Sequence, residues 1–181
     1  MMRAILVILF GMALAASAQP SRIILFRHAE KPEDPKNPHL SEAGQARAER
    51  LLGWLLRDKI LGTNGLPVAL YAPEATRQTP SRRPIETLEP TAAKLKLKIQ
   101  APYRASDYDQ LAHEILSNKS LRGKSVIICW VHDYLPQFAA ALGVHPPPGN
   151  WKSSDFESAY LITFEDGKAS LQFTKQKLRK L

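Results

Sequence analysis

The chain has 181 residues, which is enough for one domain whose core needs no covalent cross-links. Its single cysteine, Cys129, excludes an internal disulfide and is expected to act as a small buried hydrophobe. With 25 Lys and Arg against 17 Asp and Glu, the formal net charge is +8. That charge is compatible with nucleic acid, anionic lipid or phosphorylated substrates as partners, but the basic residues are scattered and identify no binding surface.

Residues 1–18 have the three parts of a secretory signal peptide. "MMR" gives a positive start, "AILVILFGMALA" is apolar, and small residues precede Gln19. The apolar run is shorter than the roughly 20 residues of a spanning helix. An uncleaved N-terminal anchor and a buried helix are the alternatives. The sequence thus predicts export to the periplasm or medium, no stable membrane anchor after cleavage and one domain over 19–181. Export argues against nucleic acid as a partner.

The first elements of that domain are a strand, a helix and a second strand. "RIILF" (22–26) is a continuous apolar run, typical of a strand buried on both faces. "LSEAGQARAERLLGWLLRDKIL" (40–61) predicts a helix with Ser41 as its N-cap and four leucines on its apolar face. "PVALYA" (67–72) predicts the next strand.

Two helices are expected to follow. "PIETLEPTAAKL" (84–95) begins with proline, which suits the first turn of a helix, while Pro90 predicts a bend or break. "SDYDQLAHEILSN" (106–118) predicts a helix capped by Ser106 or Asp107.

The last elements are a strand, a helix and a hairpin. "SVIICWV" (125–131) is the most apolar strand, and "YLPQFAAALG" (134–143) is a helix closed by Gly143. "SAYLITFEDGKASLQFTK" (158–175) predicts two strands joined at an Asp-Gly turn.

This order of elements predicts a three-layer α/β/α sandwich. A mostly parallel central sheet would carry helices on both faces, and the C-terminal hairpin would add an antiparallel edge. In such folds ligands bind beyond the carboxyl ends of the strands. One strand ends at Arg27 and His28 and another at His132, so these side chains are expected to open into the same crevice.

Four ordered segments between residues 23 and 143 resemble the histidine phosphatase superfamily, which includes phosphoglycerate mutases and many phosphatases. "RHAEK" resembles its Arg-His-Gly signature, and "LSEAGQARAERL" is similar to its Leu-Ser/Thr-x-x-Gly helix start. "SRRPIET" (81–87) resembles its Arg-Ala-x-Gln/Glu-Thr motif, and "CWVHDYLPQFAAALG" looks like its second-histidine block. Ala29 replaces the usual glycine, and Trp130 and Val131 stand where a glycine commonly precedes the second histidine, which could narrow the pocket.

The resemblance implies a small exported phosphatase that hydrolyses a phosphomonoester or phosphoprotein without a cofactor or metal. His28 would attack phosphorus from one neutral ring nitrogen, while the other donates to a backbone carbonyl. Arg27, Arg83 and His132 would bind the phosphoryl oxygens, because positioned donors stabilise the charge of the transition state. Two other arginines are alternatives to Arg83: Arg77 and Arg82.

The leaving group needs a proton, and Asp133, directly after the second histidine, is the first candidate donor. A helix N-cap is an alternative role for it. Asp107, Asp109 and Glu114 could also supply the proton, and some relatives that act on phosphoproteins have no dedicated acid. Glu30, beside the nucleophile, is expected to contact substrate or only to orient His28.

Other classes of protein are less well supported. No His-x-His or His-Glu-x-x-His spacing supports a metal hydrolase, and Gly-x-Ser-x-Gly and Gly-x-x-x-x-Gly-Lys are absent. Two rivals remain: a non-catalytic module that holds phosphate or another anion in the same pocket, and mutase-like phosphoryl transfer. "APYRASDY" (101–108) is the only candidate cap, and so small a cap favours an open pocket and a phosphatase. Neither substrate identity nor oligomeric state can be predicted.

Segments outside the four motifs give weaker predictions. The loop 29–40 could lie over the pocket and select substrates. Trp151 and Phe156 are expected to close the edge of the core rather than to contact substrate.

Overall fold

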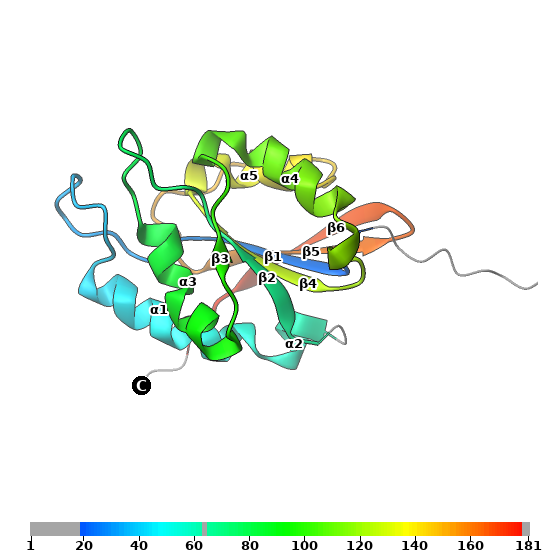
Figure 1. The fold of residues 1–181 in the computed structure, drawn as a ribbon, viewed down its shortest axis with the longest axis horizontal. Coiled ribbons are helices and arrows are strands. Elements are labelled where there is room, and N and C mark those ends of the chain that lie inside the picture. The colour runs from blue at the N-terminus through cyan, green and yellow to red at the C-terminus, as the bar shows by residue number, and fades with distance from the viewer. Residues whose placement is uncertain (1–18, 63–64, 179–181) are drawn as a thin grey trace, which may run out of the picture.

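A computed structural model describes residues 19–62 and 65–178 (Figure 1). The predicted signal peptide, 1–18, lies outside the described residues. Within them, no helix is both long enough and apolar enough to cross a membrane.

A six-stranded sheet in the order β3-β2-β4-β1-β5-β6 forms the middle of the molecule (Figure 1). β1 pairs in parallel with β4, β4 with β2 and β2 with β3, whereas β5 runs antiparallel to both β1 and β6. The strands are β1 (Arg22–Arg27), β2 (Pro67–Tyr71), β3 (Ile99–Gln100), β4 (Ser125–Trp130), β5 (Ser158–Glu165) and β6 (Lys168–Lys175). The predicted mostly parallel sheet with an antiparallel C-terminal hairpin is confirmed.

Helices cover both faces of this sheet, as predicted (Figure 1). On one face lie α1 (Glu42–Leu55), α2 (Asp58–Leu61) and α3 (Arg83–Leu95), and on the other lie α4 (Tyr108–Ser117) and α5 (Leu135–Ala141). Short 3₁₀ turns are η2 (Ala105–Asp107), η3 (Lys119–Leu121) and η4 (His132–Tyr134).

Each face of the sheet has its own hydrophobic core. Leu51, Trp54 and Leu88 from α1 and α3 pack on one face, with Phe26 and the fully buried Cys129. The other core is built from Leu111, Ile115, Phe138, Ile128 and Trp130. Because both faces are covered, the central strands are continuous apolar runs.

The first predicted helix is split. Ser41 caps α1 as predicted, accepting a hydrogen bond from the Gly44 N–H at 3.1 Å. α1 ends at Leu55 rather than continuing to residue 61, and the chain turns before α2. The turn carries Ile60 and Leu61 onto the core, where both are buried, so burial of these side chains overrides a continuous helix.

A bend or break was predicted at Pro90, and α3 does not break there. α3 runs through Pro90 from Arg83 to Leu95, because buried Leu88 and Thr91 on either side hold the helix against the sheet. Proline costs one backbone hydrogen bond, and tertiary packing compensates for it.

One of the two residues predicted to cap α4 holds the N-cap position, but its side chain does not cap the helix. Asp107 occupies the N-cap position but makes no side-chain capping bond, because its carboxylate accepts from the Ser106 hydroxyl at 2.8 Å. The hairpin turn is as predicted: Asp166 and Gly167 have φ of 48° and 77°, as a two-residue turn with two left-handed residues requires.

Candidate active site

The carboxyl ends of β1 and β4 lie side by side. Arg27 is in register with Trp130, and the His28 N–H donates to the Trp130 carbonyl at 3.1 Å. The pairing brings Arg27 and His28 next to the segment that carries His132, at the edge of the sheet where the sequence predicted a crevice.

His28 is held as a neutral imidazole whose Nε2 has no hydrogen-bond partner among the described residues. Its side chain is buried, and Nδ1 lies 2.7 Å from the Ala29 carbonyl oxygen. A carbonyl only accepts, so Nδ1 carries the proton and Nε2 keeps its lone pair. Burial, followed by the positive charges of Arg27 and Arg83, lowers the pKa of His28 to about 3. At neutral pH this ring is therefore an uncharged base with a free Nε2.

Arg27 is buried beside it and remains charged. Burial lowers the pKa of Arg27 to about 10, and the opposing effect of the Asp133 carboxylate helps to keep it protonated. Its Nη1 donates to the backbone carbonyl of Ser153. Its guanidinium carbon lies 3.8 Å from the centre of the Phe156 ring, a cation–π geometry.

Phe156 is a site residue that the sequence did not reveal. Its ring covers Arg27 and lies edge-on to His28, with ring centres 6.2 Å apart. Phe156 therefore lies against the candidate site, whereas Trp151 packs on the core residue Tyr160, as expected for a residue at the edge of the core. No periodic pattern marks the loop of Phe156, so only its aromatic character could have drawn attention to it.

Arg83 is the arginine that the fold brings towards His28. It stands at the first turn of α3, where Nε donates to the Ser81 hydroxyl at 3.1 Å and Nη1 to the Asn37 carbonyl at 3.3 Å. Its charge lowers the pKa of His28 and also of Arg27. The two alternatives are differently placed: Arg82 pairs at 3.7 Å with Glu86, and Arg77 is exposed.

His132 lies on η4 directly after β4. Its Nε2 is 3.5 Å from the Asp133 carboxylate, and burial, followed by the charge of Arg27, lowers its pKa. The fold thus gathers four of the predicted groups, Arg27, His28, Arg83 and His132, around one point.

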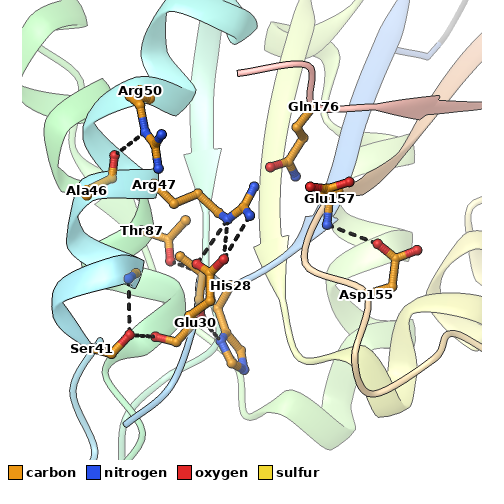
Figure 2. Close-up of polar contacts among 12 residues, drawn as sticks. His28, Glu30, Ser41, Ala46, Arg47, Arg50, Thr87, Asp155, Glu157 and Gln176 are labelled. Carbon is orange, nitrogen blue, oxygen red and sulfur yellow. Dashed lines mark hydrogen bonds and ion pairs between the residues drawn. The ribbon is translucent and has the colours of Figure 1, made fainter. Parts of the chain in front are cut away.

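Glu30 is engaged by an arginine. Its two carboxylate oxygens accept from Arg47 Nε at 2.8 and 2.9 Å, and Arg47 Nη2 lies 2.8 Å from one of them (Figure 2). Its backbone carbonyl accepts from the Ser41 N–H at 3.0 Å. These contacts join the segment after His28 to α1, so Glu30 holds the backbone beside the candidate site in place.

The segments that carry the resemblance contact one another. Thr87 accepts from the Ala29 N–H at 3.0 Å and donates to the Arg83 carbonyl at 2.7 Å. Glu86 accepts from the Leu40 N–H at 2.9 Å. Thr87 therefore joins the backbone directly after His28 to the backbone of Arg83.

A cleft of about 490 Å³ opens beside Arg83 and Asp133. It lies between the loops 35–38 and 76–81 and the segments 104–106 and 131–134, so part of the loop 29–40 does line it. Its lining residues are Pro35, Lys36, Asn37, Pro38, Thr76, Gln78, Thr79, Pro80, Ser81, Arg83, Arg104, Ala105, Ser106, Val131, Asp133 and Tyr134.

Asp133 is the one carboxylate among the described residues that line this cleft, and its side chain is 70% exposed. It is not a helix cap, since Val131 and Tyr134 hold the N-cap positions of η4 and α5. Asp109 and Glu114 line a separate depression on α4, where Glu114 accepts from the Tyr103 hydroxyl. Within 19–62 and 65–178, no cluster of three or more His, Cys, Asp or Glu side chains could hold a metal ion.

The sheet order and the helical layers on both faces give this chain the fold of solved structures that include phosphatases and a phosphoglycerate mutase. No protein-family model and no curated protein matches the sequence, but solved structures with this fold do. The protein histidine phosphatase SixA, complexed with tungstate, is 16% identical, with a TM-score of 0.55 over 86% of this chain and 97% of that one.

Two further structures show the range of proteins with this fold. A mutant phosphoserine phosphatase from Entamoeba histolytica, in complex with phosphoserine, is 12% identical, with a TM-score of 0.55 over 86% of this chain and 98% of that one. A phosphoglycerate mutase from Plasmodium falciparum is 14% identical, with a TM-score of 0.54 over 88% and 93% of the respective chains.

Proposed function

We propose that this chain is a phosphatase that hydrolyses a phosphomonoester, on a small molecule or a protein, through a phosphohistidine at His28. The observation that carries the proposal is the His28 imidazole. Its Nδ1–H donates to the Ala29 carbonyl, and Arg27, Arg83 and His132 lie close enough to the ring for their charges to act on it. Phosphatases with the same fold, such as SixA, support it.

In the first step, Nε2 of His28 forms a bond to phosphorus and the bond to the leaving oxygen breaks. Arg27, Arg83 and His132 hold the three non-bridging oxygens, over which the negative charge is spread in the transition state. The leaving oxygen takes its proton from the carboxyl group of Asp133, which lines the cleft and is protonated for this step. Water then attacks phosphorus and gives a proton to the Asp133 carboxylate, the N–P bond breaks, and inorganic phosphate, free His28 and protonated Asp133 result.

Two other activities would use the same pocket: binding of an anion without turnover, and mutase-like transfer to a second hydroxyl. Half of the residues that line the cleft beside Arg83 are exposed, so water can enter the cleft, which favours hydrolysis over transfer to a second hydroxyl.

Release of phosphate from an aryl phosphate by the purified chain tests the proposal. Wild type should turn over, and His28→Ala should lose roughly 10³-fold or more, because no neighbouring group can replace the nucleophile. His113→Ala is the matched control, since His113 is an exposed histidine on α4, and its activity should equal that of wild type. Equal activity of all three proteins would contradict the proposal, as would an inactive wild type that still binds phosphate.

We also propose export, on the basis of the N-terminal sequence. When the full chain is produced in a bacterium with a periplasm, the intact mass of the periplasmic protein should correspond to a start near Gln19. A protein that retains Met1 and stays in the cytoplasm would contradict this.

A further inference from the structure

The turn that precedes β5 holds the guanidinium of Arg27 through neutral groups. We propose that Phe156 on this turn is a positioning residue, which fixes the direction of the Arg27 guanidinium without cancelling its charge. Asp155 holds the turn in the conformation that brings Phe156 to the site. The inference rests on the proposed function, because that function assigns Arg27 to the phosphoryl oxygens.

The register of the sheet brings this turn to Arg27. β5 runs antiparallel to β1, and Ala159 lies opposite Phe26, so the residues that precede β5 lie beside the carboxyl end of β1. Nη1 of Arg27 donates to the Ser153 carbonyl, and the guanidinium carbon lies 3.8 Å from the centre of the Phe156 ring. The turn thus contacts the guanidinium both through one of its N–H groups and across its face.

These contacts orient Arg27 and leave its charge in place. A carbonyl oxygen and an aromatic ring are neutral, and among the described residues no carboxylate forms an ion pair with Arg27. Arg47 differs, because the Glu30 carboxylate pairs with it. Nε of Arg27 is buried and has no hydrogen-bond partner in the described part of the chain. An arginine in this state keeps donors and its positive charge for an oxyanion.

A fixed guanidinium is worth more to catalysis than a mobile one. Donors that already point at the developing charge need no reorganisation when the transition state forms. An arginine side chain has many rotamers, and a ring packed against the guanidinium reduces them before substrate binds. Without the ring of Phe156, Arg27 would keep its charge and lose its fixed direction.

The Asp155 carboxylate holds the turn that carries Phe156. Its Oδ1 accepts from the Glu157 N–H at 2.9 Å (Figure 2) and from the Ser158 N–H at 2.9 Å. Its Oδ2 accepts from the Ser158 hydroxyl at 2.6 Å and from the Lys175 ammonium at 3.0 Å. Burial alone would raise the pKa of Asp155, but these hydrogen bonds lower it to about 2, so the carboxylate stays ionised at neutral pH.

Steady-state kinetics with an aryl phosphate tests the role of Phe156. Phe156→Leu removes the ring and keeps an apolar side chain, so kcat and kcat/KM should both fall roughly tenfold, as for a lost interaction that acts in the transition state. Phe156→Tyr keeps the ring and should retain activity within about twofold. Phe173→Leu is the matched control, because Phe173 is an exposed phenylalanine on β6, and its rates should equal those of wild type.

A double-mutant cycle with Arg27→Gln separates positioning from a structural role. Arg27→Gln should itself lower kcat by roughly 10²–10³-fold. Phe156→Leu should then cause no further loss, because the group that it positions is gone. A ring that only packed the fold would cost the same factor with or without Arg27, and that outcome would overturn the inference. Full activity of Phe156→Leu alone would also overturn it.

Asp155→Ala extends the cycle to the turn. It should lower kcat by at least as much as Phe156→Leu, and the loss should again vanish in Arg27→Gln. Urea midpoints measured beside the rates show whether each variant is folded under the assay conditions. A folded Asp155→Ala protein with wild-type rates would contradict the role of the turn.

Binding of inorganic phosphate keeps the two proposals apart. If wild type hydrolysed no ester, the phosphatase proposal would fall, and the Kd for phosphate, measured by calorimetry, would decide the positioning role alone. Phe156→Leu should weaken phosphate binding several-fold when Arg27 is present and should have no effect in Arg27→Gln. In that case the same Kd in wild type and Phe156→Leu would overturn the inference. A chain that neither hydrolyses esters nor binds phosphate would overturn both proposals.

Discussion

The protonation of His28 links the site to the stability of the fold. Its folded pKa of about 3 is below the ordinary value of 6.5, so between these pH values the unfolded chain binds more protons than the folded chain. Stability contributed by this group is present above pH 6.5 and is lost as the pH falls towards 3.

His28→Asn should therefore reduce acid sensitivity. Between pH 6.5 and 4.5 wild type should lose up to roughly 3 kcal/mol of unfolding free energy through this group, and the variant should be spared that loss. Urea unfolding at the two pH values measures it, with His113→Asn as the exposed control. An identical loss in His28→Asn and wild type would show that His28 titrates normally.

The proposal that Arg83 binds the phosphoryl oxygens also predicts how a change of its neighbour, Arg82, affects activity. Arg83→Gln should lower kcat for an aryl phosphate by roughly 10²–10³-fold, the usual cost of a lost transition-state donor. Arg82→Gln should cost little, because Arg82 is half-exposed and lies 3.7 Å from Glu86. A larger loss of activity in Arg82→Gln than in Arg83→Gln would show that Arg82, and not Arg83, binds the phosphoryl oxygens.

Asp133 as proton donor predicts a dependence on the leaving group. Asp133→Asn should lower turnover of alkyl phosphates, whose leaving oxygen needs a proton, and nearly spare aryl phosphates with good leaving groups. Rates for both esters on wild type and Asp133→Asn decide this. Equal losses on the two esters would remove Asp133 from the role, and a selective loss in Asp107→Asn would transfer it.

Among the elements, α1 approaches the segment after β1 more closely than a side chain allows. A Cβ on Gly44 would lie 2.4 Å from the Glu30 carbonyl oxygen, whereas a Cβ on Gly53, in the same helix, would meet nothing within 4 Å. The contact explains why α1 needs glycine at position 44 and not at position 53.

Two alanine substitutions in α1 should therefore have opposite effects. Gly44→Ala should destabilise the fold by about 1–3 kcal/mol, because backbone must move. It should also lower activity, since Glu30 follows the nucleophile segment. Gly53→Ala should stabilise by about 0.5–1 kcal/mol. Urea midpoints measure both, and a stabilising Gly44→Ala would contradict the close packing of α1 on Glu30.

The elements that sequence predicted well are those with local signals. β1 and β4 are uninterrupted apolar runs, Ser41 is a capping residue, and Asp166 and Gly167 suit a left-handed turn. The errors arose where packing against other elements determines whether a helix ends or continues. The split between α1 and α2 depends on burial of Ile60, and the continuity of α3 through Pro90 depends on its packing against the sheet.

At the scale of the whole molecule, His28 and His132 could be paired from sequence because parallel strands end at one edge. The contribution of Ser153 and Phe156 could not, since a loop without periodicity reaches Arg27 only through the fold. Nor does the sequence reveal the cleft beside Arg83, which four separate segments enclose.

Covalent capture of the phosphoryl group tests the central claim most directly. Wild type mixed with an aryl phosphate and quenched in base within one turnover should carry one phosphoryl group. That group should be acid-labile and should map by peptide mass spectrometry to His28, and His28→Ala should carry none. Turnover by wild type with no phosphoryl group on His28, or an acid-stable phosphoryl group on another residue, would contradict the phosphohistidine mechanism.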